Sequence, residues 1–383
     1  MKYTSFLANG IMRKRVWLLL GTAILAATPA SVLAQDKYPI QVVPVGKGPY
    51  NFPNGFRTDF SKVNIMVTEK LSPNLYVLHG NAGVDSAHPD ASGGRMTVLF
   101  GDDGVLLVDS ENEPVGAKSL AAIRTFTQAP IKILLNSHAH PDHTGGDAFF
   151  AKQGAMIFAQ ENLRDEMMPN PNAGPRPAGA PPLQPLDPAS LPVVTYKYDP
   201  MTEGKLAVTI HMDGETVDFI PMMPSHMGGD TVVRFEKANV IYVEDFYRNF
   251  GYPFADQANG GSIKGMLRAI DLLEKLADDN TILVPGHGTL VHKKDMLPYR
   301  AMLVDLIAKV TKLRDAGKSL KDVEAANITA PYDATTLGDT QQSKDRSSAN
   351  SMLRPSPYRP SSTAGAPCRG IIHRQHFTDS DNH

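Results

Sequence analysis

Cysteine is almost absent from this sequence. Cys368 is the only cysteine among 383 residues, so no intramolecular disulfide can form. An excess of either charge is absent as well, because 38 Lys and Arg residues stand against 40 Asp and Glu residues. This balance offers no electrostatic reason for binding nucleic acid, and we expect none. With 42% hydrophobic and 20% charged residues, the composition is that of a globular protein with one large domain or two small ones.

Long hydrophobic runs are also lacking. The N-terminal apolar segment covers only residues 16–27. Basic residues 13–15 precede the apolar segment 16–27, and Val32-Leu33-Ala34 forms a small-x-small cleavage site before Gln35. This order predicts a secretory signal peptide over residues 1–34. The apolar segment is too short for a comfortable membrane span, although an uncleaved anchor stays open as the alternative. We therefore expect a periplasmic or secreted protein with no stable membrane insertion after signal cleavage.

Short strand-like runs alternate with amphipathic helical segments over most of the chain. The first group of strands is expected at 74–78, 96–100, 105–109, 131–135 and 155–159. The second group is expected at 193–196, 206–211, 216–220, 231–235, 240–243 and 281–284. Helices are expected at 113–126, 160–168, 262–277 and 302–316. Two groups of strands with such helices predict an α/β fold of αββα layering, in which two packed mixed sheets are flanked by helices.

These elements predict one domain at residues 71–317, between an N-terminal extension at 35–70 and a C-terminal extension at 318–346. Residues 169–185 are rich in Pro, Gly and Ala without periodicity, which predicts a loop. That loop is either a surface excursion or a flap near a site. From residue 347 the chain is rich in Pro, Ser and Arg and keeps no apolar period. We expect a disordered tail or an out-of-frame translation there.

The segment 138–143 reads HAHPDH and holds three imidazoles and one carboxylate. It directly follows an apolar run, so a buried strand delivers these groups to a loop. His138 and His140 share one face of an extended chain, whereas Asp142 and His143 lie beyond the bend at the proline. Imidazole nitrogen and carboxylate oxygen suit zinc, iron or manganese. The spacing therefore predicts two adjacent metal positions.

Three later residues offer further ligands. His226, Asp245 and His287 each lie at the end of an expected strand, followed by turn residues. Loops meet and carry sites at such edges of a sheet. Glycines on both sides of His287 would let the backbone turn sharply there. Glu244 is expected to face solvent or to support a ligand. Four other histidines lack these contexts and are expected to be structural: His79, His88, His211 and His292.

Together these residues resemble the metallo-β-lactamase-fold hydrolase superfamily over roughly residues 71–317. The leading His-x-His-x-Asp-His motif of that family is matched at 138–143. Its later His, Asp and Gly-His-Gly positions are matched at His226, Asp245 and His287. Asp109, at the end of an expected strand, matches a family aspartate that buttresses the ligand loop.

The resemblance implies two bound metal ions, zinc first, with iron or manganese as alternatives. The implied ligand sets are His138, His140 and His226 for one ion, Asp142, His143 and His287 for the other, and Asp245 as a bridge. The resemblance also implies hydrolysis by a hydroxide that bridges the two ions. Asp142 is then the catalytic residue that orients this hydroxide and shuttles its proton.

The implied substrate is a small molecule with an ester, lactone or amide bond, a β-lactam included. The lack of a cysteine near Asp245 departs from the cysteine-containing β-lactamases and weakens lactam hydrolysis without excluding it. Met227 stands where relatives often carry Thr, so a supporting hydrogen bond is expected to be missing. Two other functions stay open: a mononuclear iron enzyme of the persulfide dioxygenase type, and a non-enzymatic periplasmic metal-binding accessory protein. Nothing in the sequence indicates an oligomeric state.

Overall fold

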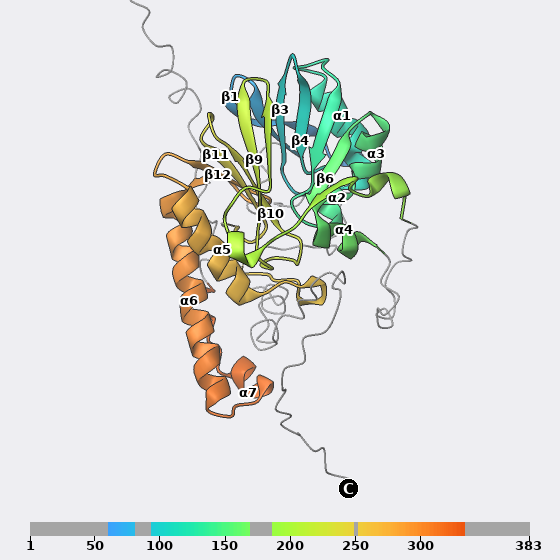
Figure 1. Cartoon of the computed structure of the whole chain (residues 1–383). Helices are drawn as coiled ribbons and strands as arrows, with labels where there is room; N and C mark the ends of the chain where they lie inside the picture. Colours follow the sequence, from blue (N-terminus) through green and yellow to red (C-terminus); the bar gives the residue numbers. More distant parts are fainter. Residues whose placement is uncertain (1–59, 81–92, 169–185, 249–251, 334–383) are drawn as a thin grey trace, which may run out of the picture. The chain divides into compact units, whose positions relative to one another are not determined.

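Two β-sheets pack face to face at the centre of the protein, which we describe from a computed structural model (Figure 1). The structure describes residues 60–80, 93–168, 186–248 and 252–333, all within the unit Tyr38–His383. One sheet has seven strands in the order β1-β2-β3-β4-β5-β6-β7. The other has six strands in the order β13-β12-β11-β10-β9-β8. Each half of the described chain therefore builds one sheet.

In the first sheet, an antiparallel meander leads into parallel strands. Its members are β1 (Ile65–Ser72), β2 (Leu75–Gly80), β3 (Met96–Gly101), β4 (Gly104–Val108), β5 (Ile131–Leu135), β6 (Met156–Gln160) and β7 (Val194–Tyr196). Strands β1 to β4 are antiparallel neighbours, and β4 to β7 are parallel. The carboxyl ends of β4 and β5 therefore lie at one edge, where Asp109 and the histidine segment follow them.

The second sheet is also mixed. Its members are β8 (Val208–Met212), β9 (Glu215–Pro221), β10 (Thr231–Phe235), β11 (Val240–Glu244), β12 (Ile282–Pro285) and β13 (Val291–His292). Only β11 and β12 are parallel neighbours; the other pairs are antiparallel. Since β9 and β11 both run against β10, the strands β9, β11 and β12 share one direction. Their carboxyl ends meet at one edge, and His226, Asp245 and His287 follow these three ends.

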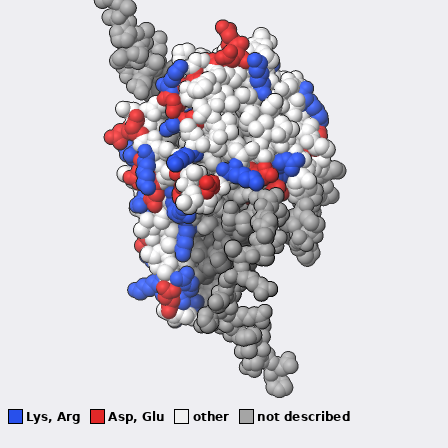
Figure 2. All heavy atoms as spheres, in the orientation of Figure 1, with Lys and Arg blue, Asp and Glu red and all other residues white. Residues whose placement is uncertain are grey.

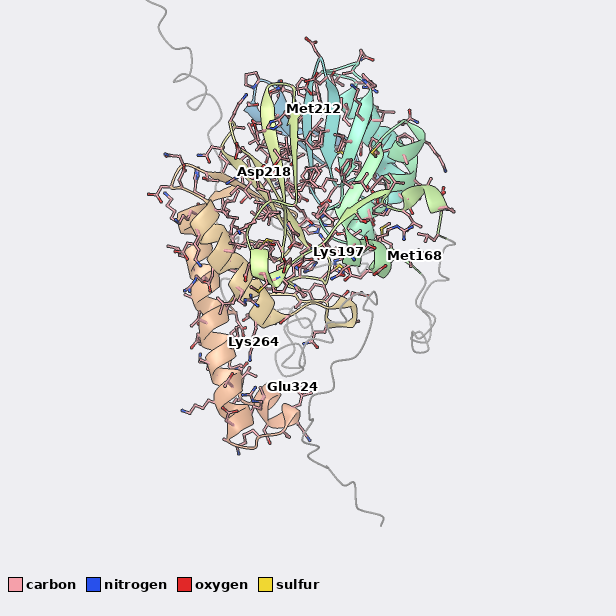
Figure 3. All side chains as sticks on the ribbon, viewed as in Figure 1. Met168, Lys197, Met212, Asp218, Lys264 and Glu324 are labelled. Atoms are coloured by element: carbon pink, nitrogen blue, oxygen red, sulfur yellow. The ribbon has the colours of Figure 1, made fainter. Side chains whose placement is uncertain are left out.

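The inner core lies between the sheets, and alternate residues of the central strands fill it. In β4, Leu106 joins the core between the sheets, while Leu107 belongs to the core under the outer helices. In β11, Tyr242 and Val243 divide in the same way. Strands buried on both faces read as continuous apolar runs, which explains their sequences. Met212, labelled in Figure 3 at the end of β8, also belongs to this inner core.

Helices cover the outer faces of both sheets (Figure 1). Helices α1 (Gly116–Ile123) and α3 (Asp147–Lys152) pack on the first sheet, and α5 (Ile263–Leu276) and α6 (Lys293–Asp315) on the second. Three shorter helices are α2 (Pro141–Thr144), α4 (Glu161–Met167) and α7 (Leu320–Ala325). Short 3₁₀ turns lie at Phe60–Lys62, Glu113–Val115, Pro188–Ser190, Pro200–Thr202, Gln257–Asn259 and Ala330–Tyr332. The predicted αββα layering is confirmed.

Some predicted element bounds differ from the structure. Strand β1 begins at Ile65 and pairs with β2, so the sheet starts before the predicted domain start at residue 71. Helix α6 begins at Lys293 instead of residue 302, and Asp295 Oδ2 accepts the N–H of His292 at 2.9 Å at its start. The C-terminal extension begins with α7, whose Val323 packs against Val310. The predicted signal peptide, the loop 169–185, the tail from 347 and His88 lie outside the described residues.

The surface of the described residues carries both charges. On the face drawn in Figure 2, Lys and Arg side chains are interspersed with Asp and Glu side chains. Among the helices that the structure describes, none combines the length and the apolar character that a membrane crossing requires.

Candidate metal centre

The seven predicted ligands lie at the shared edge of the two sheets, in two groups. The four residues of segment 138–143 follow β5, and the other three follow β9, β11 and β12. Ligand atoms of His138, His140 and His226 lie within 4.8 Å of one another. The same holds for Asp142, His143 and His287. We call these the first and the second cluster; together with the fold, they indicate a divalent-metal site.

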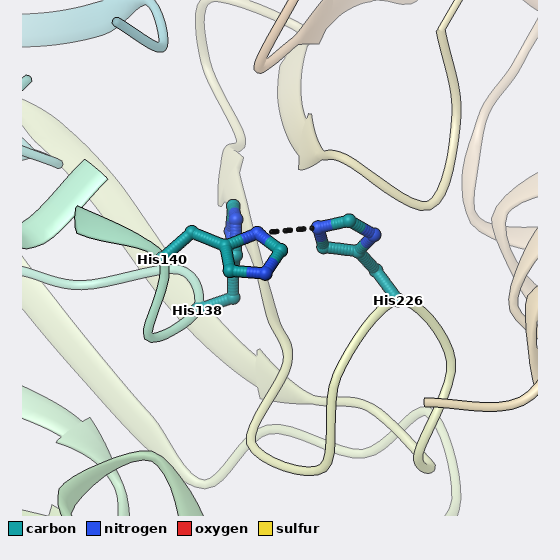
Figure 4. A group of neighbouring side chains, drawn as sticks. All are labelled: His138, His140 and His226. Carbon is teal, nitrogen blue, oxygen red and sulfur yellow. Dashed lines mark hydrogen bonds between the residues drawn. The ribbon is translucent and has the colours of Figure 1, made fainter. Parts of the chain in front are cut away.

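The first cluster consists of three imidazole rings (Figure 4). His140 Nδ1 lies 3.0 Å from His226 Nε2, and the ring of His138 lies edge-on to both others. His138 Nε2 is buried and has no hydrogen-bond partner among the described residues. A buried polar atom without a partner is costly, and coordination of a metal ion would satisfy it. These three side chains therefore fit a metal ion.

The second cluster combines two imidazoles with a carboxylate. His287 Nε2 lies 3.1 Å from Asp142 Oδ2 and 3.3 Å from His143 Nε2. The side chain of Asp142 is 34% exposed, while His143 is fully buried. Nitrogen and oxygen donors of this kind suit zinc and also iron or manganese. The carboxylate thus forms the open side of this cluster.

Asp245 lies between the two clusters. Its Oδ1 lies 3.5 Å from His143 Nε2, and its Oδ2 lies 3.3 Å from His287 Nε2 and 3.8 Å from His226 Nε2. Asp245 Oδ1 is also buried without a hydrogen-bond partner among the described residues. One carboxylate therefore reaches ligand atoms of both clusters.

Gly286 leaves the space that the side chains of Asp245 and His143 occupy. A Cβ atom on Gly286 would lie 2.1 Å from Asp245 Oδ1 and 2.8 Å from His143 Cε1. The turn itself is made by Gly288, whose φ is +100°. The prediction that both glycines serve the turn is therefore wrong for Gly286, which is required for space.

Asp109 supports the second cluster from behind. Its Oδ2 lies 2.7 Å from His143 Nδ1 and accepts hydrogen bonds from the hydroxyls of Tyr242 and Ser137, each at 2.7 Å. Its Oδ1 accepts the backbone N–H of Ser137 at 2.7 Å. The carboxylate thereby orients His143 so that Nε2 faces the cluster. This is the buttressing contact that the family resemblance implied.

Three carboxylates support the ligands, and two of them, Asp230 and Asp256, were not identified as such from the sequence. Asp230 accepts the backbone N–H groups of His226 at 2.7 Å and Met227 at 3.0 Å, which fixes the His226 loop. Its place in a Gly-Gly-Asp turn was the available signal. Glu244 is fully buried with Oε2 3.5 Å from His138 Nδ1, so the solvent-facing alternative for it is wrong. The third is Asp256, whose Oδ2 lies 3.1 Å from His140 Nε2.

Burial keeps two rings of the first cluster, His138 and His226, neutral. It lowers the pKa of His138 well below its usual value, helped by the neighbouring imidazoles. Burial and His140 lower the pKa of His226 to about 3. Both rings are therefore neutral near pH 7. A neutral imidazole is the form that binds a metal ion.

Carboxylates set the charge of the second cluster. Burial alone would lower the pKa of His143, but Asp245, Asp142 and Asp109 outweigh it and raise that pKa to about 9. Burial would raise the pKa of Asp245, yet His287 and His143 bring it down to about 2. The site therefore places ionised carboxylates around a position that a cation fits.

Three of the histidines expected to be structural, His79, His211 and His292, lie among the described residues and outside both clusters. His79 Nε2 lies 2.9 Å from the backbone oxygen of Gly93. His211 is exposed on β8 beside Thr216, and His292 precedes α6. Met227 is buried, and its backbone N–H bonds to Asp230.

Comparison with known proteins agrees with this geometry. A family model described as the metallo-beta-lactamase superfamily matches residues 90–287, more than half of the chain. This chain belongs to the metallo-beta-lactamase superfamily. A curated relative, the alpha subunit of 2,4-dinitroanisole O-demethylase from Nocardioides sp. (strain JS1661), is 27% identical over 153 residues. That match covers 39% of this chain and only 40% of the relative.

Two solved structures that are similar to this chain have different described activities. A stereoselective inverting sec-alkylsulfatase from Pseudomonas sp. has a TM-score of 0.50 and 19% identity, covering 69% of this chain and 45% of that one. A metallo-beta-lactamase from Pontibacter korlensis has a TM-score of 0.48 and 16% identity, covering 64% of this chain and 100% of that one. At 19% identity, the likeness to the sulfatase concerns the fold alone.

Proposed function

We propose that this protein is an exported, binuclear metal-dependent hydrolase that cleaves an ester, lactone or amide bond of a small molecule, a β-lactam included. The position of Asp245 carries the proposal, because its two carboxylate oxygens face His143 in one cluster and His226 in the other. A mononuclear enzyme of the persulfide dioxygenase type binds its ion through fewer ligands. The assembled second cluster therefore favours two ions.

Zinc is the metal that we propose, with iron or manganese accepted by the same donors. His138, His140 and His226 would hold one ion, Asp142, His143 and His287 the other, and Asp245 both. When bound, such a pair supplies a Lewis acid for the scissile bond and lowers the pKa of a shared water. The protein supplies the buried, oriented ligands: Asp109 fixes the ring of His143, and Asp230 fixes the loop of His226.

Asp142 is the carboxylate best placed to handle a proton. Its side chain is 34% exposed, against 6% for Asp245, so an incoming water can reach it. Burial would raise the pKa of Asp142, but His143 and His287 lower it far below its usual value. The carboxylate is therefore ionised near neutral pH. We propose that it orients the attacking water and accepts its proton.

Three observations bear on the substrate and the location. The sequence has no cysteine near Asp245, unlike the cysteine-containing β-lactamases, so the ligands alone do not select the type of bond that is cleaved. The described activities of the two relatives add an aryl methyl ether and an alkyl sulfate to the candidate substrates. Export is proposed from the signal-like residues 1–34, and sequencing of the mature N-terminus at Gln35 tests it.

The test uses one purified sample of the full chain. We expect two zinc ions per chain and hydrolysis in a screen of β-lactam, acyl-homoserine lactone, thioester, aryl ester and alkyl sulfate substrates. One iron per chain with oxygen consumption would instead support the dioxygenase alternative. Bound metal without turnover of any substrate in the screen would support the accessory-protein alternative.

His140→Ala is the matched variant for this test. Loss of one ring from the first cluster should lower bound metal and abolish activity, while the far-ultraviolet circular dichroism spectrum stays that of the wild type. Metals per chain and turnover are measured on the same preparation. Wild-type turnover by the metal-replete variant would refute the assignment of His140 as a ligand.

A further inference from the structure

Asp256 contacts the one ligand ring of the first cluster that presents Nδ1 to its neighbours. Its Oδ2 lies 3.1 Å from His140 Nε2, while His140 Nδ1 lies 3.0 Å from His226 Nε2. A neutral imidazole carries its hydrogen on only one of its two nitrogens. A carboxylate beside Nε2 keeps the hydrogen there, which leaves the Nδ1 lone pair directed into the cluster.

The backbone holds Asp256 in place independently of its side chain. Its N–H donates to the carbonyl oxygen of His226 at 2.8 Å, and its own carbonyl accepts the N–H of Gly261 at 2.7 Å. A Cβ atom on Gly261 would lie 2.3 Å from the His226 oxygen, so the chain passes too closely for any other residue. The turn after Asp256 is therefore fixed against the His226 loop.

The side chain of Asp256 is positioned as well. Its Oδ2 accepts a hydrogen bond from Asn259 Nδ2 at 2.8 Å, and its Oδ1 accepts the N–H of Ala258 at 3.1 Å. The same segment contributes Phe254, whose carbonyl oxygen lies 2.8 Å from His226 Nδ1 and whose ring stacks on His140. Residues 252–262 thus contact two of the three rings of the first cluster, from the side opposite to the cluster.

We propose that Asp256 is a positioning residue for metal binding, which holds His140 as the Nδ1 ligand of the first cluster and strengthens that nitrogen as a donor. This proposal rests on the proposed metal-binding function. Asp256 serves His140 as Asp109 serves His143, so each cluster has a carboxylate behind one ring. Carboxylates in this position raise the basicity of the ligating ring.

Asp256 is suited to a test by substitution, because its side chain is 18% exposed whereas Asp109 is fully buried. The variants are Asp256→Asn, which keeps an acceptor oxygen without charge, and Asp256→Ala, which removes both. Asp199→Ala is the matched control, because Asp199 also caps a 3₁₀ turn, accepting the N–H of Met201. It lies outside both clusters.

The experiment titrates zinc into the metal-free full chain against a chromogenic chelator, with the Tm of each metal-free protein measured alongside. We expect one of the two zinc ions to bind about 10-fold more weakly in Asp256→Asn and about 100-fold more weakly in Asp256→Ala. The other ion and the Asp199→Ala control should keep wild-type affinity.

Wild-type affinity for both ions in Asp256→Ala would overturn the proposal. So would an equal weakening in Asp256→Ala and Asp199→Ala that follows their loss of Tm, because the carboxylate would then act only as a turn cap. Failure of the wild-type protein to bind zinc would refute the proposed function itself. These outcomes separate the two inferences.

Discussion

At the residue scale, two residues directly beside the candidate metal centre have a strained backbone. Asp109 and Glu244 adopt left-handed conformations with φ of 62° and 46°. A non-glycine residue in this region costs on the order of 1–3 kcal/mol and persists only where its surroundings over-determine it. The hydrogen bonds that Asp109 makes to Ser137, Tyr242 and His143 provide this restraint. The unfavourable backbone conformation of Asp109 therefore lowers the stability of the fold, while its hydrogen bonds orient His143.

Asp142→Asn tests proton transfer separately from metal binding. The amide oxygen can still face the second cluster, but the side chain no longer accepts a proton. We expect some metal to stay bound while kcat falls by roughly 10²–10⁴, the usual contribution of a positioned acid or base. Metal content and kcat are measured together. A wild-type kcat would remove Asp142 from the proton-transfer step.

Gly286→Ala tests the close approach beneath Asp245. The added Cβ would lie 2.1 Å from Asp245 Oδ1, so the bridging carboxylate must shift and bound metal should be lost. Gly214→Ala is the control, because its φ of +77° makes any side chain unfavourable while its Cβ meets open space, so this variant loses stability without a clash. The control should lose about 1–2 kcal/mol of stability and keep its metal. Full metal content in Gly286→Ala would show that metal binding does not need the close packing of residue 286 against Asp245.

The supporting residues were harder to predict than the ligands. The ligands follow strand ends and form a spaced motif, so their side chains could be grouped from the sequence. Asp256 contacts His140 only because the chain folds back after β11, and no local pattern records that return. Asp230 lies in a recognisable turn, but its acceptor role depends on the path of the His226 loop.

At the element scale, burial decides which strands the sequence could predict. Strands β5 and β10 have the predicted bounds, and their apolar runs reflect burial on both faces. Strand β1 was missed because it lies at the sheet edge and none of its residues is fully buried. The start of α6 was misplaced because its first turns contain Pro298 and three charged residues, which hide the helical period.

Helix α4 connects the first sheet to the His226 loop, and its contact predicts a pH effect. Asn162 Nδ2 donates to the Gly228 carbonyl at 3.1 Å, and the Gly228 N–H donates to Glu166 Oε1 at 3.0 Å. Burial, then the charge of Asp230, raises the pKa of Glu166 from 4.5 to about 9. The folded protein therefore favours the neutral carboxyl. The stabilisation that the neutral Glu166 side chain contributes to the free energy of unfolding is complete below pH 4.5, and it is lost as the pH rises towards 9.

Glu166→Gln should remove that pH dependence, since the amide stays neutral throughout. We expect the free energy of unfolding of the metal-free variant to fall less between about pH 5 and pH 9 than that of the wild type. Denaturant unfolding at several pH values measures the difference. Glu161→Gln, on the same helix, controls for the change in net charge. Parallel curves for the wild type and Glu166→Gln would contradict the prediction.

At the scale of the whole molecule, the metal centre joins the two sheets. One sheet supplies the four ligands of segment 138–143, and the other supplies His226, Asp245 and His287. Bound ions would therefore stabilise the packing of one sheet on the other as well as the loops. The αββα fold was predictable because both inner faces are apolar. That the ligand-bearing edge of one sheet lies against the ligand-bearing edge of the other is seen only in the three-dimensional structure.

Removal of metal should lower thermal stability. At free zinc about 100-fold above Kd, binding contributes about 2.7 kcal/mol per site, or roughly 5–10 °C in Tm for a domain of this size. Differential scanning calorimetry with and without a chelator measures the shift. His140→Ala should show a smaller shift than the wild type. An unchanged Tm after complete metal removal would contradict a metal site that joins the sheets.

The division of ligands between the sheets also orders events during synthesis of the chain. Translation delivers segment 138–143 well before the strands that face it, and the first cluster is complete in sequence only at His226. The second cluster waits for His287, near the end of the second sheet. A growing chain therefore lacks part of the binuclear site until His287 has been added. Which metal binds is then decided by the complete ligand set and by the metals present in the compartment where the protein folds.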